Sequence, residues 1–526
     1  MTIEPIKVLG AQYTVRDARS QNAGSCAMLP DPEIGSIHYR AQEVLPTGLF
    51  VAIEGQTADG HDYIDQALAK RAAAVVVQKP VATATPAATT GLNPVLVQVP
   101  DTRIALADLA ACFYGYPSKQ LNIIGITGTN GKTTVAYLIE SIFAAAGLNV
   151  GVISTINYRY AGKTFNNPMT TPEALDLQRI LAEMLHNGVT HVVMEASSHA
   201  MDLYRVKNCW FDVAVFTNLS QDHLDYHGDM ATYWASKKRL FTEYLQQGPK
   251  RQRAMAIVNC DDVRGKELPR ILTTPMIKTG SAPDADITAE TFRCEAMGTF
   301  GRVSTREGSF DFKTPLVGKH NVDNILSAAG VATALNIAPE TITAGIQALS
   351  GIPGRLERID NNSERFVYVD YAHTPDALEN AVMSLKKIAP ARIICIFGCG
   401  GDRDHAKRPL MGDIAGRLCD LAIVTSDNPR TEDPLAIIDQ ILSGIRRSGM
   451  AQYSSRDVSD GFKKKGFVVE ADRRRAIELG IRLSRPQDMV LIAGKGHETY
   501  QIIGKTSIDF DDRQEARKAL RAVGGQ

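Results

Sequence analysis

The chain has 526 residues, of which 44% are hydrophobic and 22% are charged, as in an ordinary globular protein. At ~150 residues per domain, this length predicts three or four domains. Lysine and arginine together number 58, as do aspartate and glutamate, so the formal net charge is zero. That balance argues against a general binder of nucleic acids or anionic membranes, which needs an excess of basic residues. We expect no nucleic-acid partner.

Neither membrane insertion nor secretion is expected from the sequence. No apolar run approaches the ~20 residues that a membrane span requires, and the first residues, MTIEPIKVLGAQY, lack the basic-then-apolar order of a secretory signal. The eight cysteines form no CxxC pair. A reduced, cytoplasmic protein is therefore expected.

The first block runs to about residue 104. It contains a strand-like run at 49–55, a helical run at 62–73 and two further strand-like runs at 73–78 and 95–99. Between the last two runs, a stretch rich in Pro, Ala and Thr at 80–94 is typical of a surface loop.

The second block covers about residues 105–352. After a helical run at 105–115, a β-branched strand at 121–127 leads into TGTNGKTT, a helix at 135–147 and another strand at 149–155. This order is a βαβ unit, which predicts a parallel sheet with a right-handed crossover. Three more short apolar runs, at 191–197, 212–218 and 254–260, extend the predicted sheet.

The third block, residues 353–526, repeats the alternation of strands and helices. The predicted strands are 365–370, 392–398, 421–427, 466–472 and 489–495, and the predicted helices are 375–388, 407–418, 434–445 and 472–483. Such alternation indicates a second doubly wound α/β unit. The sequence thus predicts an α/β protein of three domains, with a central P-loop-type ATPase domain and a C-terminal Rossmann-like domain.

The stretch GTNGKTT is the most informative part of the sequence. Its glycines allow backbone N–H groups to surround phosphate oxygens at a helix N-terminus. Lys132 is expected to reach the β- and γ-phosphates, and Thr133 to place its hydroxyl on Mg²⁺. The strict pattern has glycine at 126, where this chain has Ile126, with Gly125 one place earlier. The full stretch is Gly128, Thr129, Asn130, Gly131, Lys132, Thr133 and Thr134.

Two acidic segments follow predicted strands of the same block. Glu195 lies at the carboxyl end of the strand at 191–197, where α/β proteins form ligand sites, and its carboxylate suits Mg²⁺. A solvated turn residue is the alternative there. The segment DHLDYH at 222–227 has two acids and two histidines, which suggests metal or phosphate chemistry. Polar loop residues that bond to each other would explain it equally well.

Ten motifs occur in one order along the chain: TGTNGKTT, ExSSH, NLSQDHLDYHG, YWASKKRLF, GKHNVDN, GIPGRLE, VDYAHTPDAL, GCGGDRD, SDNPR and AGKGHE. In this respect, the sequence from about residue 30 to the C-terminus resembles the Mur ligases of peptidoglycan precursor synthesis. Gly125, one place early, is also the usual form of the loop in that family.

The resemblance is strongest to the branch that adds the third peptide residue. It implies an ATP-dependent ligase that joins meso-diaminopimelate to UDP-N-acetylmuramoyl-L-alanyl-D-glutamate through an acyl phosphate, with two Mg²⁺ ions. It also implies a substrate-binding domain at 1–104, an ATP-binding domain at 105–352 and an amino-acid-binding domain at 353–526. A monomer is expected.

The resemblance also assigns the ATP and metal site. It implies Thr133 and Glu195 as ligands of one ion, and His223 and Lys237, the latter as a carbamate (N6-carboxylysine), at the other. Without it, Lys237 would be an ordinary exposed helix lysine. Asn321 and Asn324 match the pair that reads adenine, while Arg355 and Asp370 close onto ATP. The catalytic residues implied are Lys132, Glu195, His223, Lys237, Arg355 and Asp370.

Two further sets follow from the resemblance. The implied contacts of the UDP substrate are Ile37, Tyr39, Gln56, Thr57, Ala58, Thr170, Thr171, Ser197 and Arg205. The implied contacts of the incoming amino acid are Arg403, Asp427, Asn428, Pro429, Arg430, Gly494 and Glu498. The second set lies in three loops after predicted strands of one domain. Two arginines and a glutamate could clasp a carboxylate and an ammonium, although plain surface turns would also explain these loops.

Two alternatives remain at this point. A lysine-adding or folylpolyglutamate-type ligase shares the ATP machinery, but DNPR and Arg403 are not expected in it. A P-loop nucleotide switch that makes no covalent product is the alternative from another class. A GTPase switch would carry an NKxD-like guanine-reading loop, and the sequence has none. Phosphate release that requires both a UDP-linked dipeptide and an amino acid would separate these possibilities.

Overall fold

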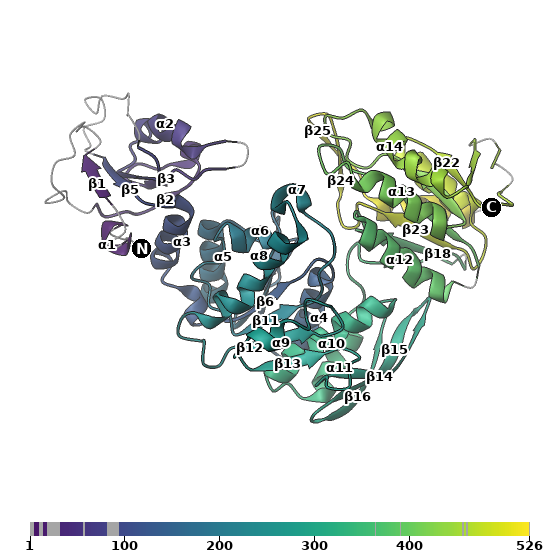
Figure 1. The fold of residues 1–526 in the computed structure, drawn as a ribbon, viewed down its shortest axis with the longest axis horizontal. Coiled ribbons are helices and arrows are strands. Elements are labelled where there is room, and N and C mark those ends of the chain that lie inside the picture. Colours follow the sequence, from purple (N-terminus) through teal and green to yellow (C-terminus); the bar gives the residue numbers. More distant parts are fainter. Residues whose placement is uncertain are drawn as a thin grey trace.

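The computed structural model describes residues 5–9, 14–17, 32–55, 58–80, 94–362, 364–389, 391–454, 457–458 and 461–524. In this part of the chain, helices and sheets form three α/β domains in chain order, with the central domain between the other two (Figure 1). The expected fold class is confirmed. None of the described helices has the length and apolar character needed to cross a membrane.

The N-terminal domain is built on a five-stranded sheet of order β1-β5-β4-β3-β2, parallel except for the β1–β5 pair. Its strands are β1 (Thr14–Asp17), β2 (Ile37–His38), β3 (Leu49–Val51), β4 (Ala74–Val77) and β5 (Val95–Gln98), and its helices are α1 (Pro5–Leu9), α2 (Ile64–Ala69) and α3 (Thr102–Phe113). Helix α3 begins where the Asp101 carboxylate accepts two backbone N–H groups, and it packs into this domain's core. The domain divisions at 104 and 352 remain predictions.

The central domain contains an eight-stranded sheet of order β13-β12-β11-β6-β10-β7-β8-β9. The strands are β6 (Asn122–Thr127), β7 (Val150–Ile153), β8 (Tyr158–Tyr160), β9 (Lys163–Phe165), β10 (His191–Glu195), β11 (Val213–Phe216), β12 (Met255–Asn259) and β13 (Met276–Thr279). All pairs are parallel except those of β8 with its neighbours. The carboxyl ends of β11, β6 and β10 therefore lie side by side.

Helices cover both faces of this sheet because successive apolar residues of its strands point to opposite sides. Ile123 belongs to one core and Ile124 to the other. The helices are α4 (Lys132–Ala145), α5 (Ala174–His186), α6 (Ser198–Asp202), α7 (Leu224–His227), α8 (Met230–Thr242), α9 (Leu268–Ile271), α10 (Lys319–Ala334) and α11 (Pro339–Ala348). A three-stranded antiparallel sheet, β14 (Thr288–Glu295), β15 (Gly298–Thr305) and β16 (Gly308–Thr314), completes the domain.

The C-terminal domain has a seven-stranded sheet of order β17-β18-β23-β19-β20-β22-β21, parallel except for β17. Its strands are β17 (Glu357–Ile359), β18 (Phe366–Asp370), β19 (Ile393–Phe397), β20 (Leu421–Val424), β21 (Ala451–Tyr453), β22 (Gly466–Val469) and β23 (Met489–Ala493), with a hairpin of β24 (Tyr500–Ile503) and β25 (Thr506–Asp509). Its helices are α12 (Pro375–Ile388), α13 (Lys407–Leu418), α14 (Pro434–Arg447), α15 (Arg473–Leu483) and α16 (Asp512–Gly524).

Sequence and structure differ in several elements, of which three are instructive. The helical run expected at 62–73 is a 3₁₀ turn at Gly60–Tyr63 followed by the short α2, and Arg71 beyond it has a left-handed φ of 67°. The expected loop at 80–94 lies almost wholly outside the described residues. Both the β8–β9 hairpin and the β14–β16 sheet are absent from the sequence prediction, because their strands are short or partly exposed and lack a long apolar run.

Candidate active site

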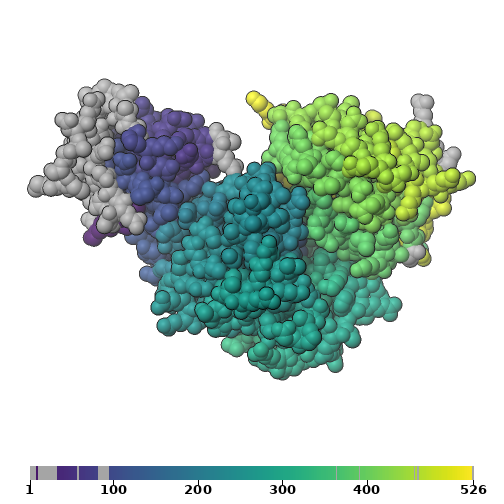
Figure 2. Space-filling view, in the orientation of Figure 1, coloured from purple at the N-terminus to yellow at the C-terminus, as the bar shows by residue number. Residues whose placement is uncertain are grey.

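A cavity of about 530 Å³ lies between the central and C-terminal domains. In the space-filling view, the surface is hollowed between the first and third domains, above the central one (Figure 2). Residues from both domains line the cavity. Of the expected site residues, it brings together Thr129, Asn130, Gly131, Lys132, Thr133, Thr134, Thr170, Glu195, Ser197, His223, Lys237, Asn321, Asn324, Arg355 and Asp370.

The loop after β6 requires glycine at two positions. Gly128 and Gly131 have φ of 145° and 88°, which residues with a Cβ rarely adopt. A Cβ at Gly128 would lie 1.9 Å from Thr217 Oγ1, and one at Gly131 would lie 2.3 Å from Asn324 Oδ1. The loop is held from below by Thr217, whose hydroxyl donates to the carbonyl oxygen of Asn130 at 2.7 Å.

Gly125, upstream of this loop, has a role in packing rather than in the turn of the loop. Gly125 lies inside β6, and a Cβ there would meet the ring of Phe211 at 2.5 Å. Ile126, at the position of glycine in the strict pattern, is fully buried in the core that contains α4. Gly125 therefore allows the Phe211 ring to pack closely against β6, and the glycine-rich loop itself begins at Gly128.

Two lysines lie against this loop. Lys132 Nζ donates to the carbonyl oxygens of Gly128 and Thr129 at 3.0 and 2.8 Å. Lys237 Nζ, on α8, donates to the same Gly128 oxygen at 2.7 Å and lies 4.4 Å from the centre of the Tyr233 ring. Lys237 is only 1% exposed, in contrast to the surface lysine that the sequence alone indicates. Burial and the charge of Lys132 hold the pKa of Lys237 well below its usual range.

Glu195 is likewise buried and is bound on both carboxylate oxygens. Thr133 Oγ1 donates to its Oε1 at 2.8 Å, and the backbone N–H of Thr155 donates to the same oxygen at 2.9 Å. The Thr155 hydroxyl donates to Oε2 at 3.0 Å. Thr155 is a site residue that the sequence reasoning missed, and its place at the end of the strand next to Glu195 was the available signal. The alternative of a solvated turn residue is wrong for Glu195, which is 1% exposed.

The hard oxygen donors that Mg²⁺ prefers are thus present at the loop. Thr133 and Glu195 offer a hydroxyl and a carboxylate in contact with each other. His223 also lines the cavity, with its Nε2 3.3 Å from an oxygen of Asp222. No group of three or more His, Cys, Asp and Glu in the described ranges is arranged to hold a metal by itself. Mg²⁺ commonly takes one or two carboxylates and completes its shell with water and substrate phosphates.

The two asparagines expected to read adenine lie in the first turns of α10. Asn324 Nδ2 donates to Asn321 Oδ1 at 3.1 Å, and Asn321 Nδ2 donates to the carbonyl oxygen of Val317 at 2.8 Å. Both side chains are buried at the cavity wall. These bonds fix the amide orientations, which suits selective hydrogen bonding to a base edge.

Arg355 and Asp370 approach from the C-terminal side. Arg355 Nη2 donates to Thr133 Oγ1 at 3.2 Å, and its guanidinium lies 4.6 Å from the centre of the Tyr371 ring. Asp370 accepts the backbone N–H groups of Leu356 and Ala372 at 2.6 and 2.8 Å. Burial raises the pKa of the Asp370 carboxyl. Asp370 therefore holds the backbone next to Arg355 in place.

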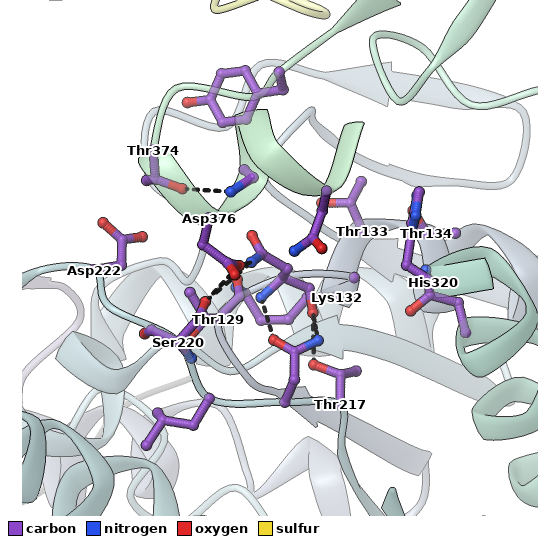
Figure 3. A pocket seen from close by; sticks show the side chains of 18 of the residues that line it. Thr129, Lys132, Thr133, Thr134, Thr217, Ser220, Asp222, His320, Thr374 and Asp376 are labelled. Atoms are coloured by element: carbon purple, nitrogen blue, oxygen red, sulfur yellow. Dashed lines mark hydrogen bonds between the residues drawn. The ribbon is translucent and has the colours of Figure 1, made fainter. Parts of the chain in front are cut away.

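A further contact across the cavity was not expected from the sequence. Asp376, in the first turn of α12, accepts hydrogen bonds from Asn130 Nδ2 at 2.7 Å and from Ser220 Oγ at 2.8 Å. Figure 3 shows Asp376 reaching from its helix toward Ser220 and the loop around Thr129. Lys132, Thr133 and Thr134, labelled in the same view, line the same cavity as Asp376. The Asp376 carboxylate thus links the C-terminal domain to the glycine-rich loop at 128–134. His373, another residue near the seam, directs its Nδ1 to the Tyr371 carbonyl oxygen at 2.8 Å.

The expected contacts of the UDP substrate are divided between two domains. Thr171 Oγ1 donates to the carbonyl oxygen of Glu195 at 2.7 Å and accepts the backbone N–H of Ser197 at 3.1 Å. Arg205 Nη1 donates to the Thr171 carbonyl oxygen at 3.2 Å, and its Nε lies 3.4 Å from Glu173. Thr170 pairs with Thr155 at 3.1 Å. These central-domain residues form one cluster beside Glu195.

The other candidates belong to the N-terminal domain. The Ile37 side chain is buried in the core of the first sheet, and the Tyr39 hydroxyl donates to Asp176 at 2.7 Å. Ala58 is exposed, and Gln56 and Thr57 lie outside the described residues. None of these described candidates lines the cavity.

The amino-acid candidates lie together at the edge of the C-terminal sheet. The strands β23, β19 and β20 are adjacent in the sheet, and the loops that follow them carry Gly494, Arg403 and Asp427. Asn428 Nδ2 donates to Glu498 Oε2 at 2.9 Å. The buried Lys495, which the sequence reasoning did not single out, donates to the same oxygen at 3.0 Å.

Arginine side chains and tight backbone turns complete this cluster. Arg430 has a left-handed φ of 51°, and its Nη1 donates to the carbonyl oxygen of Gly401 at 2.8 Å. Arg403 donates to the Asp402 carbonyl oxygen at 2.9 Å. Gly494 has φ of 118°, and a Cβ there would lie 2.5 Å from an oxygen of Asp427. Pro429, which precedes Arg430 in the sequence, is buried. The three loops expected to meet at this edge do so.

Comparison with known proteins places the chain among close relatives. It matches the family descriptions "Mur ligase family, catalytic domain" over residues 33–114, "Mur ligase middle domain" over 126–332 and "Mur ligase, glutamate ligase domain" over 354–496. A protein of Geobacter metallireducens named UDP-N-acetylmuramoyl-L-alanyl-D-glutamate–2,6-diaminopimelate ligase is 46% identical over 507 residues, which cover 96% of this chain and 97% of that protein.

Solved structures agree with the sequence comparison. A structure of a protein of the same name is 29% identical, with a TM-score of 0.66 and 99% coverage of both chains. The MurF ligase of Thermotoga maritima in complex with ADP shares the fold at 18% identity, with a TM-score of 0.61 over 93% of this chain and 97% of that one. The chain contains the three family domains in order and is 46% identical to a relative over 96% of its own length, so it belongs to the Mur ligase family.

Proposed function

We propose that this protein is an ATP-dependent ligase that joins meso-diaminopimelate to UDP-N-acetylmuramoyl-L-alanyl-D-glutamate in peptidoglycan precursor synthesis. The name of the 46%-identical relative supports the choice of substrates. The observation in the molecule that carries the proposal is the meeting of two domains over one loop, where Arg355 of the C-terminal domain contacts Thr133. That the enzyme works as a cytoplasmic monomer stays a prediction.

The loop and its neighbours are suited to phosphoryl transfer, which depends mainly on positioning and on neutralising charge. In the proposed reaction, the γ-phosphoryl group of ATP passes to the D-glutamyl carboxylate, and an amine of the amino acid then displaces phosphate from the acyl phosphate. Lys132 and Arg355 would face the transferred group from the two domains, and Asn321 and Asn324 would orient the base. Because the residues that would bind ATP come from both domains, ATP binding would favour the arrangement in which the C-terminal domain contacts the central domain.

Two Mg²⁺ ions are part of the proposal. Thr133 and Glu195 would hold one ion, and His223 and Lys237 the other, with the lysine present as a carbamate. An ammonium cannot bind a cation, whereas the buried and preferentially neutral amine of Lys237 can add CO₂ and become an anion. Bound Mg²⁺ would neutralise the phosphate charges during transfer.

The substrates would lie on either side of this centre. We propose that Thr170, Thr171, Ser197 and Arg205 bind the muramoyl-peptide part, with Ile37, Tyr39, Gln56, Thr57 and Ala58 on the side of the uridine diphosphate. The opposite side offers the three-loop cluster to the incoming amino acid. There Arg403 and Arg430 would bind the distal carboxylate of diaminopimelate, Glu498 the distal ammonium, and Asp427, Asn428, Pro429 and Gly494 would shape the pocket.

A phosphate-release assay with single omissions tests this function. Phosphate should appear only when ATP, the UDP-linked dipeptide and meso-diaminopimelate are all present, and mass spectrometry should show a UDP-linked tripeptide in equal amount. Phosphate release that needs neither the dipeptide nor an amino acid would instead favour a nucleotide switch. Release with a folate substrate and glutamate would favour the folylpolyglutamate type.

A further inference from the structure

Two of the loops expected to bind the incoming amino acid, those of GCGGDRD and DNPR, are joined by a pair of side chains that lies outside both motifs. Arg408 is on α13, and Glu432 follows the DNPR loop. The two form a bidentate pair, with Nη1 to Oε2 at 2.9 Å and Nη2 to Oε1 at 2.8 Å. Arg408 Nη2 also donates to the carbonyl oxygen of Gly400 at 3.0 Å. One guanidinium thus holds the GCGGDRD loop and the segment after DNPR together.

The joined loops carry Arg403 and Arg430. Glu432 accepts the backbone N–H of Asp402, the residue next to Arg403. In return, the Asp402 carboxylate accepts the Thr431 hydroxyl at 2.7 Å, next to Arg430. Each loop therefore binds the other beside its own arginine.

The pair is built to be rigid. Arg408 is fully buried, and its Nη1 also donates to Gln440 of α14 at 2.9 Å. The Arg408 guanidinium lowers the pKa of the Glu432 carboxyl to about 2, so Glu432 remains ionised throughout the neutral range. Bidentate pairing restricts both distance and plane, unlike a single ionic contact. The two loops also lie in close contact, since a Cβ at Gly401 would lie 1.9 Å from the Pro429 carbonyl oxygen.

We propose that Arg408 and Glu432 are positioning residues that set the separation of Arg403 and Arg430, and so make the enzyme select an amino acid with a second carboxylate. This inference rests on the proposed function. In this proposal, neither Arg408 nor Glu432 touches the substrate. They act by fixing the two loops whose arginines do.

The test is the ratio of kcat/KM for meso-diaminopimelate to kcat/KM for L-lysine. Lysine has no distal carboxylate, so loosened arginines should weaken diaminopimelate far more than lysine. Glu432→Gln, which keeps the shape but removes the charge, should lower the ratio at least tenfold and raise the KM for diaminopimelate. The KM for ATP should stay within twofold of the intact enzyme.

Two further variants frame the result. Glu432→Asp keeps the carboxylate on a shorter side chain and should fall between the intact enzyme and Glu432→Gln. Asp413→Asn breaks another pair on α13, with Arg417, at 2.8 Å on the surface, and should leave the ratio unchanged. If Glu432→Gln fails to fold, the ratio in Glu432→Asp decides.

Equal losses for both amino acids would overturn the inference, because a merely structural pair affects them alike. Intact enzyme that makes no tripeptide from diaminopimelate would contradict the proposed function instead. The two failures are therefore distinguishable in the same set of assays.

Discussion

Lys132 and Lys237 both donate to the carbonyl oxygen of Gly128, at 3.0 and 2.7 Å. Two ammonium groups on one acceptor repel each other, and Lys237 is almost completely buried. The nearby Asp222 carboxylate attracts the Lys237 ammonium. Burial and the charge of Lys132 outweigh that attraction and favour the neutral amine. A neutral amine can attack CO₂ and lose a proton, which converts Lys237 from a cation into an anion.

Lys237→Ala is therefore expected to be almost inactive, and short-chain carboxylic acids should restore part of the activity by replacing the missing anion. Steady-state assays with and without acetate would measure this rescue. Lys238→Ala, at the neighbouring position of α8 outside the cavity, is the matched control and should keep full activity. An unmodified amine at Lys237 in a high-resolution map of the ATP–Mg²⁺ complex would contradict the prediction.

Lys132→Ala should reduce kcat by about two to three orders of magnitude, because charge neutralisation at the phosphates is lost. The fold should survive, since the Nζ bonds of Lys132 are to carbonyl oxygens of a loop that Thr217 also holds. Circular dichroism and the thermal midpoint measure the fold, and phosphate release measures turnover. Near-normal ligation by a well-folded Lys132→Ala protein would remove this lysine from the mechanism.

Asp376→Asn should loosen the C-terminal domain from the loop in the absence of nucleotide. The carboxylate accepts bonds from Asn130 and Ser220 across the cavity, and a charged hydrogen bond contributes about 1.5–3 kcal/mol. Small-angle scattering of the ATP-free protein should show a larger radius of gyration. Glu379→Gln, on the same helix but paired with Arg417 of α13, should leave it unchanged. An equal radius for Asp376→Asn and the intact protein would show that this contact does not hold the domains.

Arg430→Ala should raise the KM for diaminopimelate far more than the KM for ATP. Stranding the substrate carboxylate costs a few kcal/mol, or roughly a hundredfold in kcat/KM. Arg430→Lys should rescue poorly, because a point charge does not reproduce a planar, two-pronged donor. Initial rates over a range of both substrates supply the two constants. Equal rises in both would mean that Arg430 supports the domain rather than the amino acid.

Much of the fold followed from local patterns. The helix at 375–388 has the predicted bounds, because it has a clear apolar stripe and begins at the Thr374-Pro375 signal. The helix at 407–418 also has the predicted bounds. The sheet edge that unites Gly494, Arg403 and Asp427 followed from the rule that parallel strands share their carboxyl ends.

Long-range contacts could not be predicted in the same way. Asp376 and Asn130 are 246 residues apart, and nothing near either residue indicates the other. The burial of Lys237 depends on α8 packing against the loop after β6, so local sequence alone indicates a surface lysine. Likewise, Arg408 and Glu432 belong to a helix and a loop whose pairing appears only when the strands of one sheet are placed in order.

The central claim is that the enzyme adds diaminopimelate, and the most direct test is the amino-acid preference of the intact protein. The measurement is kcat/KM for meso-diaminopimelate divided by kcat/KM for L-lysine, at saturating ATP and UDP-linked dipeptide. Arg403 and Arg430, left without a carboxylate when lysine binds, predict a ratio of roughly a hundred or more. A ratio at or below one would contradict the account.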